Sequence, residues 1–257
     1  MAIESAATGA AGAVIRWIEL PGSGPVRVYL HGLGAMAAPY FTEIAAHPLL
    51  AGHRSLLVDL LGFGLSDRPA DFDYRLESHA DAVADALRAA GVSGADLIGH
   101  SMGGAVAIVL AHRHPELVAR LVVVEPNLDP ITPSRRPGSS GLATYTESEF
   151  LAGGWAEVLD RVGPYWAATM RLADPLAVHR SAVELFRGSV PIMRELLTAL
   201  PQRRTLLAGE ESGLPDRADE LEAAGVELIT IPAAGHNVML DQPDAFARAV
   251  AEVLGRA

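Results

Sequence analysis

Lysine and cysteine are both absent from this 257-residue chain, and all 20 residues counted as Lys or Arg are arginine. The lack of lysine excludes Schiff-base and pyridoxal-phosphate chemistry and a standard P-loop. The lack of cysteine excludes thiol catalysis, disulfides, iron–sulfur clusters and thiolate zinc sites. Covalent catalysis is therefore left to Ser, Thr, Asp, Glu, His or Tyr.

Positive charge is also scarce, since the formal net charge is −11 and the pI is near 5.2. This charge disfavours nucleic acid and anionic membranes as partners. No apolar run approaches the ~20 residues that span a bilayer, and residues 1–13 lack the basic and apolar regions of a signal peptide. We therefore expect a cytoplasmic protein that acts on a small molecule, with composition compatible with a homo-oligomer.

Apolar runs alternate with helix-period segments along most of the chain, which predicts an open α/β sheet of largely parallel strands. Strands are expected at Val14–Leu20, Val26–His31, Arg54–Asp59, Ala95–His100, Arg120–Glu125, Arg203–Ala208 and Val226–Ile231. Helices are expected most clearly at Leu76–Ala90, Met102–Arg113, Ala218–Ala224 and Asp244–Leu254.

The alternation stops once, between Pro126 and Pro201, where no strand pattern is found. Helical patterns fill this region, at Glu147–Ala152, Trp155–Leu172, Pro175–Arg187 and Val190–Leu200. We expect residues 129–200 to form a helical cap over a core of residues 1–128 and 201–257. The aromatic residues of this cap either form its own core or face a ligand.

The sequence Gly99-His100-Ser101-Met102-Gly103-Gly104 follows one predicted strand and precedes a predicted helix. A G-x-S-x-G motif in this setting is typical of a nucleophile elbow, in which a strained turn exposes the serine at the carboxyl end of the strand. The adjacent helix N-terminus can stabilise an oxyanion. Ser101 is therefore the candidate nucleophile.

A serine nucleophile needs a base and donors for the oxyanion. His236 follows the last predicted strand, in Pro232-Ala233-Ala234-Gly235-His236-Asn237, where it can reach Ser101. His100 is expected to point the other way and to act as a packing neighbour. The glycine-rich turn after His31 and the elbow itself offer the backbone N–H groups of Leu33 and Met102 as oxyanion donors. Asp59 is expected to anchor the next glycine-rich loop by local hydrogen bonds.

These motifs, in this order, resemble the α/β-hydrolase superfamily: His31-Gly32, Asp59–Ser66, Gly99–Gly104, and Gly235-His236 followed by Asp241-Gln242-Pro243. The resemblance spans about Val14 to Leu254. It implies a mostly parallel eight-stranded sheet, a helical cap inserted after the sixth strand, and a Ser–acid–His triad. It requires no metal or organic cofactor.

The acid of the triad departs from the usual pattern of the superfamily. Most relatives carry an aspartate after the strand before the last, but this chain has Gly209-Glu210-Glu211-Ser212 there. Some members place a carboxylate after an earlier strand, where this chain has Glu125. A buried acid at a strand end needs a partner, so we favour Glu125. Glu210 or Glu211, and then Asp96 or Asp129, are the alternatives.

A serine in place of the aspartate nucleophile of related dehalogenases and epoxide hydrolases indicates acyl transfer. The favoured function is hydrolysis of a carboxylic ester or lactone of a small-to-medium apolar substrate through an acyl-enzyme. The alternatives on the same triad are a C–C bond hydrolase and a cofactor-free perhydrolase. A non-catalytic ligand-binding relative is a third hypothesis.

Overall fold

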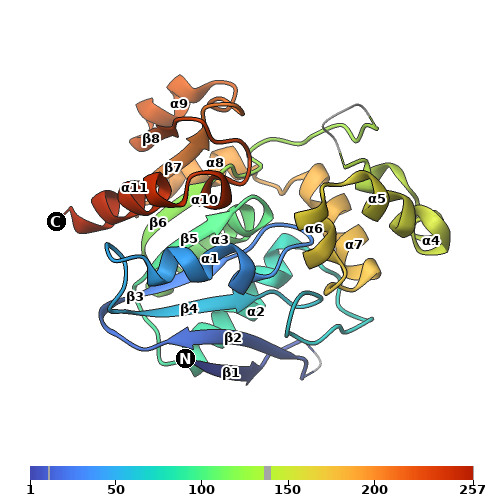
Figure 1. The fold of residues 1–257 in the computed structure, drawn as a ribbon, viewed down its shortest axis with the longest axis horizontal. Coiled ribbons are helices and arrows are strands. Elements are labelled where there is room, and N and C mark those ends of the chain that lie inside the picture. Colours follow the sequence, from blue (N-terminus) through green and yellow to red (C-terminus); the bar gives the residue numbers. More distant parts are fainter. Residues whose placement is uncertain (11, 136–139, 257) are drawn as a thin grey trace.

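The computed structural model describes residues 1–10, 12–135 and 140–256 and contains one eight-stranded sheet with helices on both faces (Figure 1). The strand order is β1-β2-β4-β3-β5-β6-β7-β8, with β1–β2 and β2–β4 antiparallel and all other pairs parallel. The strands are β1 Ala2–Ala7, β2 Val14–Leu20, β3 Ser23–Leu30, β4 His53–Asp59, β5 Ala95–His100, β6 Val118–Val124, β7 Arg203–Gly209 and β8 Val226–Ile231. The predicted mostly parallel, eight-stranded α/β-hydrolase sheet is confirmed.

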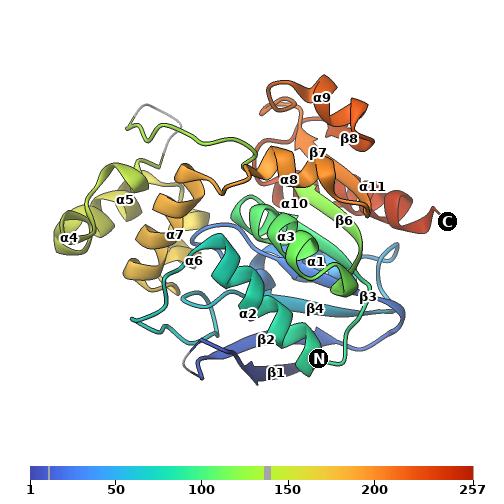
Figure 2. The same cartoon turned by 180° about the vertical axis from the view of Figure 1, so that it is seen from behind.

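Two helical layers sandwich the sheet (Figures 1 and 2). One face is covered by α1 (Ala37–Ala46), α10 (Val238–Asp241) and α11 (Pro243–Gly255), and the other by α2 (Leu76–Ala89), α3 (Met102–Arg113) and α8 (Met193–Ala199). Successive strand residues alternate between the two layers, as Leu121 and Val123 pack in one core and Val122 and Val124 in the other. This alternation explains the continuous apolar runs in the sequence.

A set of helices between β6 and β7 projects from one side of the sheet (Figures 1 and 2). It comprises the 3₁₀ turn η2 (Leu142–Thr144), α4 (Glu147–Glu149), the π-helix η3 (Phe150–Gly154), α5 (Trp155–Arg161), α6 (Pro164–Met170) and α7 (Pro175–Arg187). The short 3₁₀ turn η1 (Pro115–Leu117) belongs to the core, between α3 and β6. The remaining helix of the core, α9 (Ala218–Ala223), packs beside β8. α8 lies in the range predicted as cap, but it packs against α3 of the core.

Several element predictions differ from the structure. The strand β1 and the helix α1 were not predicted: β1 is short and mostly exposed, and the apolar period of α1 (Ala37, Tyr40, Phe41, Ile44 and Ala45) was overlooked. The single helix expected over Trp155–Leu172 is divided into α5 and α6, since Gly163 and Pro164 interrupt it. In the described part of the chain, no helix has the length and apolarity needed to span a bilayer.

Candidate active site

The turn between β5 and α3 places Ser101 in a strained backbone conformation, with φ 52° and ψ −119°. The glycines around it are required by close contact: a Cβ on Gly99 would lie 2.4 Å from the Gly103 carbonyl oxygen, and one on Gly103 would lie 2.4 Å from the carbonyl oxygen of Leu30. The strand, turn and helix therefore form the elbow that the sequence predicts. Ser101 remains 9 % exposed, at the floor of a cavity.

His236 lies in the loop between β8 and α10, at the same carboxyl edge of the sheet as Ser101. Its side chain is about half exposed, and its Nδ1 lies 3.5 Å from Glu125 Oε2. Ser101 Oγ has no hydrogen-bond partner among the described residues. Distances between catalytic groups are often long before substrate binds, so the arrangement is compatible with a base that closes on Ser101 during reaction.

Glu125 follows β6 directly and has a positive φ of 50°. Its backbone N–H donates to the Leu207 carbonyl, and its Oε1 accepts a 2.7 Å hydrogen bond from the Gly209 N–H. These contacts leave Oε2 directed to His236. The Glu125 carboxylate is 12 % exposed and has both a backbone donor and an imidazole as partners, which offsets the cost of its burial.

The other acids considered from the sequence are engaged elsewhere. Glu210 Oε2 accepts a hydrogen bond from the Ala233 N–H. Glu211 is exposed, and among the described residues it forms no hydrogen bond with the His236 ring. Asp96 forms a two-point ion pair with Arg120. Asp129 pairs with Arg194 and Arg217. Of these acids, only Glu125 contacts His236 among the described residues.

The backbone N–H groups of Leu33 and Met102 have no acceptor among the described residues. Met102 is the first residue of α3, where N–H groups have no partner within the helix. Both residues adjoin Ser101 or its cavity. Two unpaired donors beside the serine are what an oxyanion hole needs.

These groups surround a cavity of about 620 Å³ between the core and the projecting helices. Its walls include Leu33, Ser101, Glu125 and His236, together with apolar and uncharged polar side chains. The apolar and uncharged polar side chains of the wall include Tyr40, Asn127, Ile131, Thr132, Trp166, Leu185, Phe186 and Asn237. No arginine lines the cavity among the described residues, so its electrostatics suit an uncharged ligand.

The predicted direction of His100 is wrong, because the residue lines this cavity, but its predicted role as a packing neighbour is confirmed by its 2 % exposure and its ring contacts. Its Nε2 lies 2.9 Å from the His236 carbonyl oxygen, and its ring centroid lies 4.8 Å from that of His236. Burial, with the nearby His236, holds the pKa of His100 well below its usual range. The neutral His100 therefore donates its Nε2 proton to the loop that carries His236.

Sequence reasoning did not identify Tyr40 as a contributor to this cavity. Tyr40, from α1, stacks on His100, and burial raises its pKa to about 12, so its hydroxyl is neutral at neutral pH. Trp166, from α6, lines the cavity, whereas Trp155 packs edge-on against Phe150 inside the cap. Trp155 therefore belongs to the cap's own core, whereas Trp166 lies in the cavity wall, where it could face a ligand.

Asp59 has the anchoring contacts that the sequence predicts. Its carboxylate accepts hydrogen bonds from the N–H groups of Ala37 and Leu65. Burial raises the pKa of Asp59, and the neighbouring His31 and these backbone donors oppose that rise. Asp59 thus fixes the start of α1 to the glycine-rich loop after β4.

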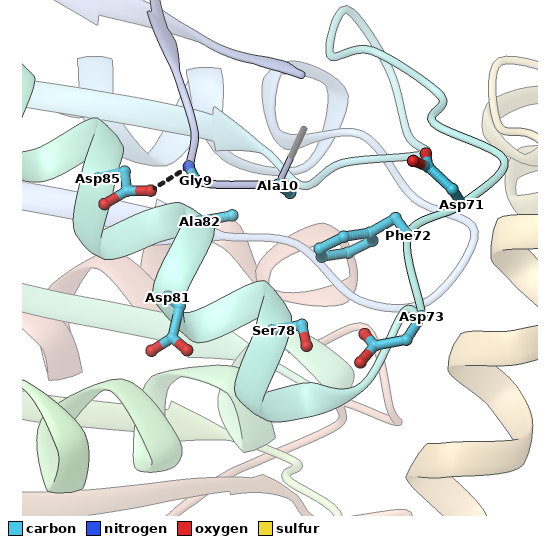
Figure 3. Close-up of a pocket in the computed structure, with 9 residues that line it drawn as sticks. All are labelled: Gly9, Ala10, Asp71, Phe72, Asp73, Ser78, Asp81, Ala82 and Asp85. Carbon is cyan, nitrogen blue, oxygen red and sulfur yellow. Dashed lines mark hydrogen bonds between the residues drawn. The ribbon is translucent and has the colours of Figure 1, made fainter. Parts of the chain in front are cut away.

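A second cavity, of about 470 Å³, lies far from the serine, between the β1–β2 turn and α2 (Figure 3). Four aspartates line it, and Asp85 accepts a hydrogen bond from the Gly9 N–H while Asp81 pairs with Arg113 and His114. The described residues contain no cluster of His, Asp and Glu side chains suited to a metal ion. Asp73 likewise accepts a hydrogen bond from the Arg75 N–H, so three of the four aspartates have local structural partners.

The sequence of the chain is similar to those of known hydrolases. A family model described as alpha/beta hydrolase fold matches residues 25–242. A 2-hydroxymuconate semialdehyde hydrolase of Pseudomonas sp. (strain CF600) is 34 % identical over 163 residues, which are 63 % of this chain and about half, 51 %, of the relative. An esterase of Mycobacterium tuberculosis is 29 % identical over 95 % of this chain and 87 % of its own.

The fold matches solved structures over nearly the whole chain. The enol-lactonase from Burkholderia xenovorans LB400 has a TM-score of 0.78 at 21 % identity, with 98 % of this chain and 100 % of the other covered. The family match spans the elbow, the cap region and the His236 loop. The chain belongs to the α/β-hydrolase family.

Proposed function

We propose that this protein hydrolyses a carboxylic ester or lactone of a small-to-medium, uncharged substrate through an acyl-enzyme on Ser101. His236 takes the Ser101 proton as general base, delivers it to the leaving group and then activates water for deacylation. Glu125 orients the His236 ring through Nδ1 and stabilises the imidazolium. The N–H groups of Leu33 and Met102 stabilise the tetrahedral oxyanion.

One observation carries this proposal: an elbow serine, two unpaired backbone donors and a carboxylate-paired histidine lie around one cavity. This set matches the needs of acyl transfer and uses only the residue types that the composition allows. The cavity of about 620 Å³ is large enough for a small or medium acyl group.

The choice of an uncharged ester or lactone rests on the cavity walls. Their charged side chains, among the described residues, are limited to Glu125 and to His236 when protonated. A carboxylate on the substrate would meet no arginine there, and its desolvation would be costly. The second candidate, C–C bond hydrolysis on the same triad, is favoured by the similarity to the 2-hydroxymuconate semialdehyde hydrolase.

Turnover of three substrate sets separates these candidates: p-nitrophenyl esters of increasing acyl length, γ- and δ-lactones, and 2-hydroxy-6-oxo-dienoates. We expect the highest kcat/KM with a neutral ester or lactone, and a loss of at least about 10⁴-fold in Ser101→Ala. A higher kcat/KM for a dienoate would indicate the C–C hydrolase. Fluorophosphonate labelling of Ser101 without turnover of any substrate would indicate the ligand-binding role.

A further inference from the structure

The peptide group before Leu33 is held from the core by His31. The Leu60 N–H donates to His31 Nε2 at 3.1 Å, so the ring proton is on Nδ1, which lies 2.8 Å from the Gly32 carbonyl oxygen. Burial lowers the pKa of His31 and keeps the ring neutral. In a planar trans peptide, fixing the Gly32 carbonyl also fixes the opposite direction of the Leu33 N–H.

The peptide group after Leu33 is held from the cap. Trp166 Nε1 on α6 donates a 2.8 Å hydrogen bond to the Leu33 carbonyl oxygen. Contact between α6 and this turn is close: a Cβ on Gly34, which has φ 66°, would lie 2.6 Å from Met170 Cγ and 2.8 Å from Trp166 Nε1. With both flanking peptide planes held, the φ and ψ of Leu33 have little freedom.

We propose that Trp166 is a positioning residue of the oxyanion hole, so that the cap helix α6 holds the Leu33 N–H in its catalytic direction. The inference rests on the proposed acyl transfer but goes beyond it. The contact of the cap helix α6 with Leu33 would then contribute to stabilisation of the transition state. This contribution is separate from any role of the cap in enclosing the substrate. Trp166 acts here through Leu33 and need not touch the reacting atoms.

Trp166→Phe tests the proposal, because it removes the N–H donor and keeps an aromatic ring. With p-nitrophenyl acetate, whose acyl group is too small to fill the cavity, we expect kcat and kcat/KM to fall together by about tenfold. A matched control is Tyr165→Phe on the same helix, which removes the Tyr165 hydroxyl from the Pro39 carbonyl oxygen but leaves the Leu33 contact. We expect the control to stay within about twofold of wild type.

Amide hydrogen exchange of residues 32–36 gives a readout that does not need turnover. The proposal expects faster exchange of this segment in Trp166→Phe than in wild type or Tyr165→Phe. Unchanged kcat, a rise in KM alone, or unchanged exchange would overturn it, since Trp166 would then only line the cavity. If Trp166→Phe does not fold, the benzothiophene analogue of tryptophan at position 166 removes the N–H with nearly the same shape.

The two proposals fail in different ways. A wild-type enzyme that turns over no ester or lactone contradicts the proposed function, whereas the exchange measurement still decides whether Trp166 holds the turn. An active wild type with an unaffected Trp166→Phe contradicts only the role of Trp166.

Discussion

Two non-glycine residues of the candidate site, Ser101 and Glu125, have positive φ values of 52° and 50°. A left-handed backbone costs an L-residue about 1–2 kcal/mol, so neighbouring hydrogen bonds must hold each one. The Ser101 N–H donates to the Val124 carbonyl, and the Glu125 N–H donates to the Leu207 carbonyl. The strain is thus located where the side chains must leave the sheet and enter the cavity.

The identity of the acid is testable by removing charge without changing shape. Glu125→Gln keeps the hydrogen bond to Gly209 but cannot stabilise the imidazolium of His236, so we expect kcat for p-nitrophenyl acetate to fall by about 10³–10⁴-fold. Glu210→Gln and Glu211→Gln are matched controls from the usual acid position, and each should remain within a few-fold of wild type. Near wild-type kcat in Glu125→Gln, with a loss of several orders of magnitude in Glu211→Gln, would contradict the assignment.

The residue types of the site could be predicted from sequence, but their contacts could not. Ser101 has a local motif, and His236 follows a clear strand. The relation of Glu125 to His236 depends on the neighbouring ends of β6, β7 and β8, which are far apart in the chain. The direction of the His100 side chain could not be predicted, because the strand alternation alone does not show that the turn brings its ring beside His236.

At the level of elements, the base of the cap is fixed to the core by contacts between α2 and α7. His79 Nε2 on α2 lies 3.2 Å from Ser181 Oγ on α7, and the His79 ring is surrounded by Phe63, Phe72 and Tyr74. Burial is the main cause that lowers the pKa of His79 to about 3, and the nearby His31 adds to this shift, whereas Asp73 opposes it. The imidazole is therefore neutral in the folded protein across the physiological range.

This buried imidazole predicts a loss of stability in acid. The unfolded chain binds a proton at His79 near its ordinary pKa of about 6.5, but the folded chain does not until near pH 3. The free energy of unfolding should therefore be unaffected by this group above pH 6.5 and fall as the pH drops below it. Between pH 6.5 and 4.5 the loss from His79 is about 2 kcal/mol.

Urea unfolding of wild type and His79→Gln at pH 7.5 and 4.5 measures how much His79 contributes to the loss of unfolding free energy in acid. The variant can still hydrogen-bond Ser181 but has no proton to bind, so its stability should fall less between the two pH values. His112→Gln, at an exposed position on α3, serves as the control and should retain the wild-type dependence. If the free energy of unfolding falls equally in wild type and His79→Gln, His79 does not cause the loss of stability in acid.

Elements with strong apolar patterns could be predicted almost to the residue, including β2, β5, β8, α3 and α7. Elements that depend on tertiary contacts could not. The edge strand β1 consists mostly of Ala and Ser and is exposed, and pairing with β2 alone defines it. The helix α1 begins where the Asp59 carboxylate accepts the Ala37 N–H, a contact between segments 22 residues apart.

On the scale of the whole molecule, neither the fold nor the family determines which reaction the protein catalyses. The chain is similar in sequence to an esterase and, over part of its length, to a 2-hydroxymuconate semialdehyde hydrolase, and it shares its fold with an enol-lactonase. In this chain, the cavity between core and cap brings together Tyr40, His100 and Trp166 from three separate parts of the sequence. No local pattern could have shown that these side chains share one wall.

The central claim is that catalysis passes through an acyl group on Ser101. It is tested most directly by peptide mapping of wild-type protein quenched in acid during turnover of a p-nitrophenyl ester, within the initial burst of p-nitrophenol. The account predicts one acyl group per chain, on the peptide that contains Ser101, and none in Ser101→Ala. An acyl group found on another residue during turnover would contradict the account. A full burst of p-nitrophenol with no acylated peptide would also contradict it.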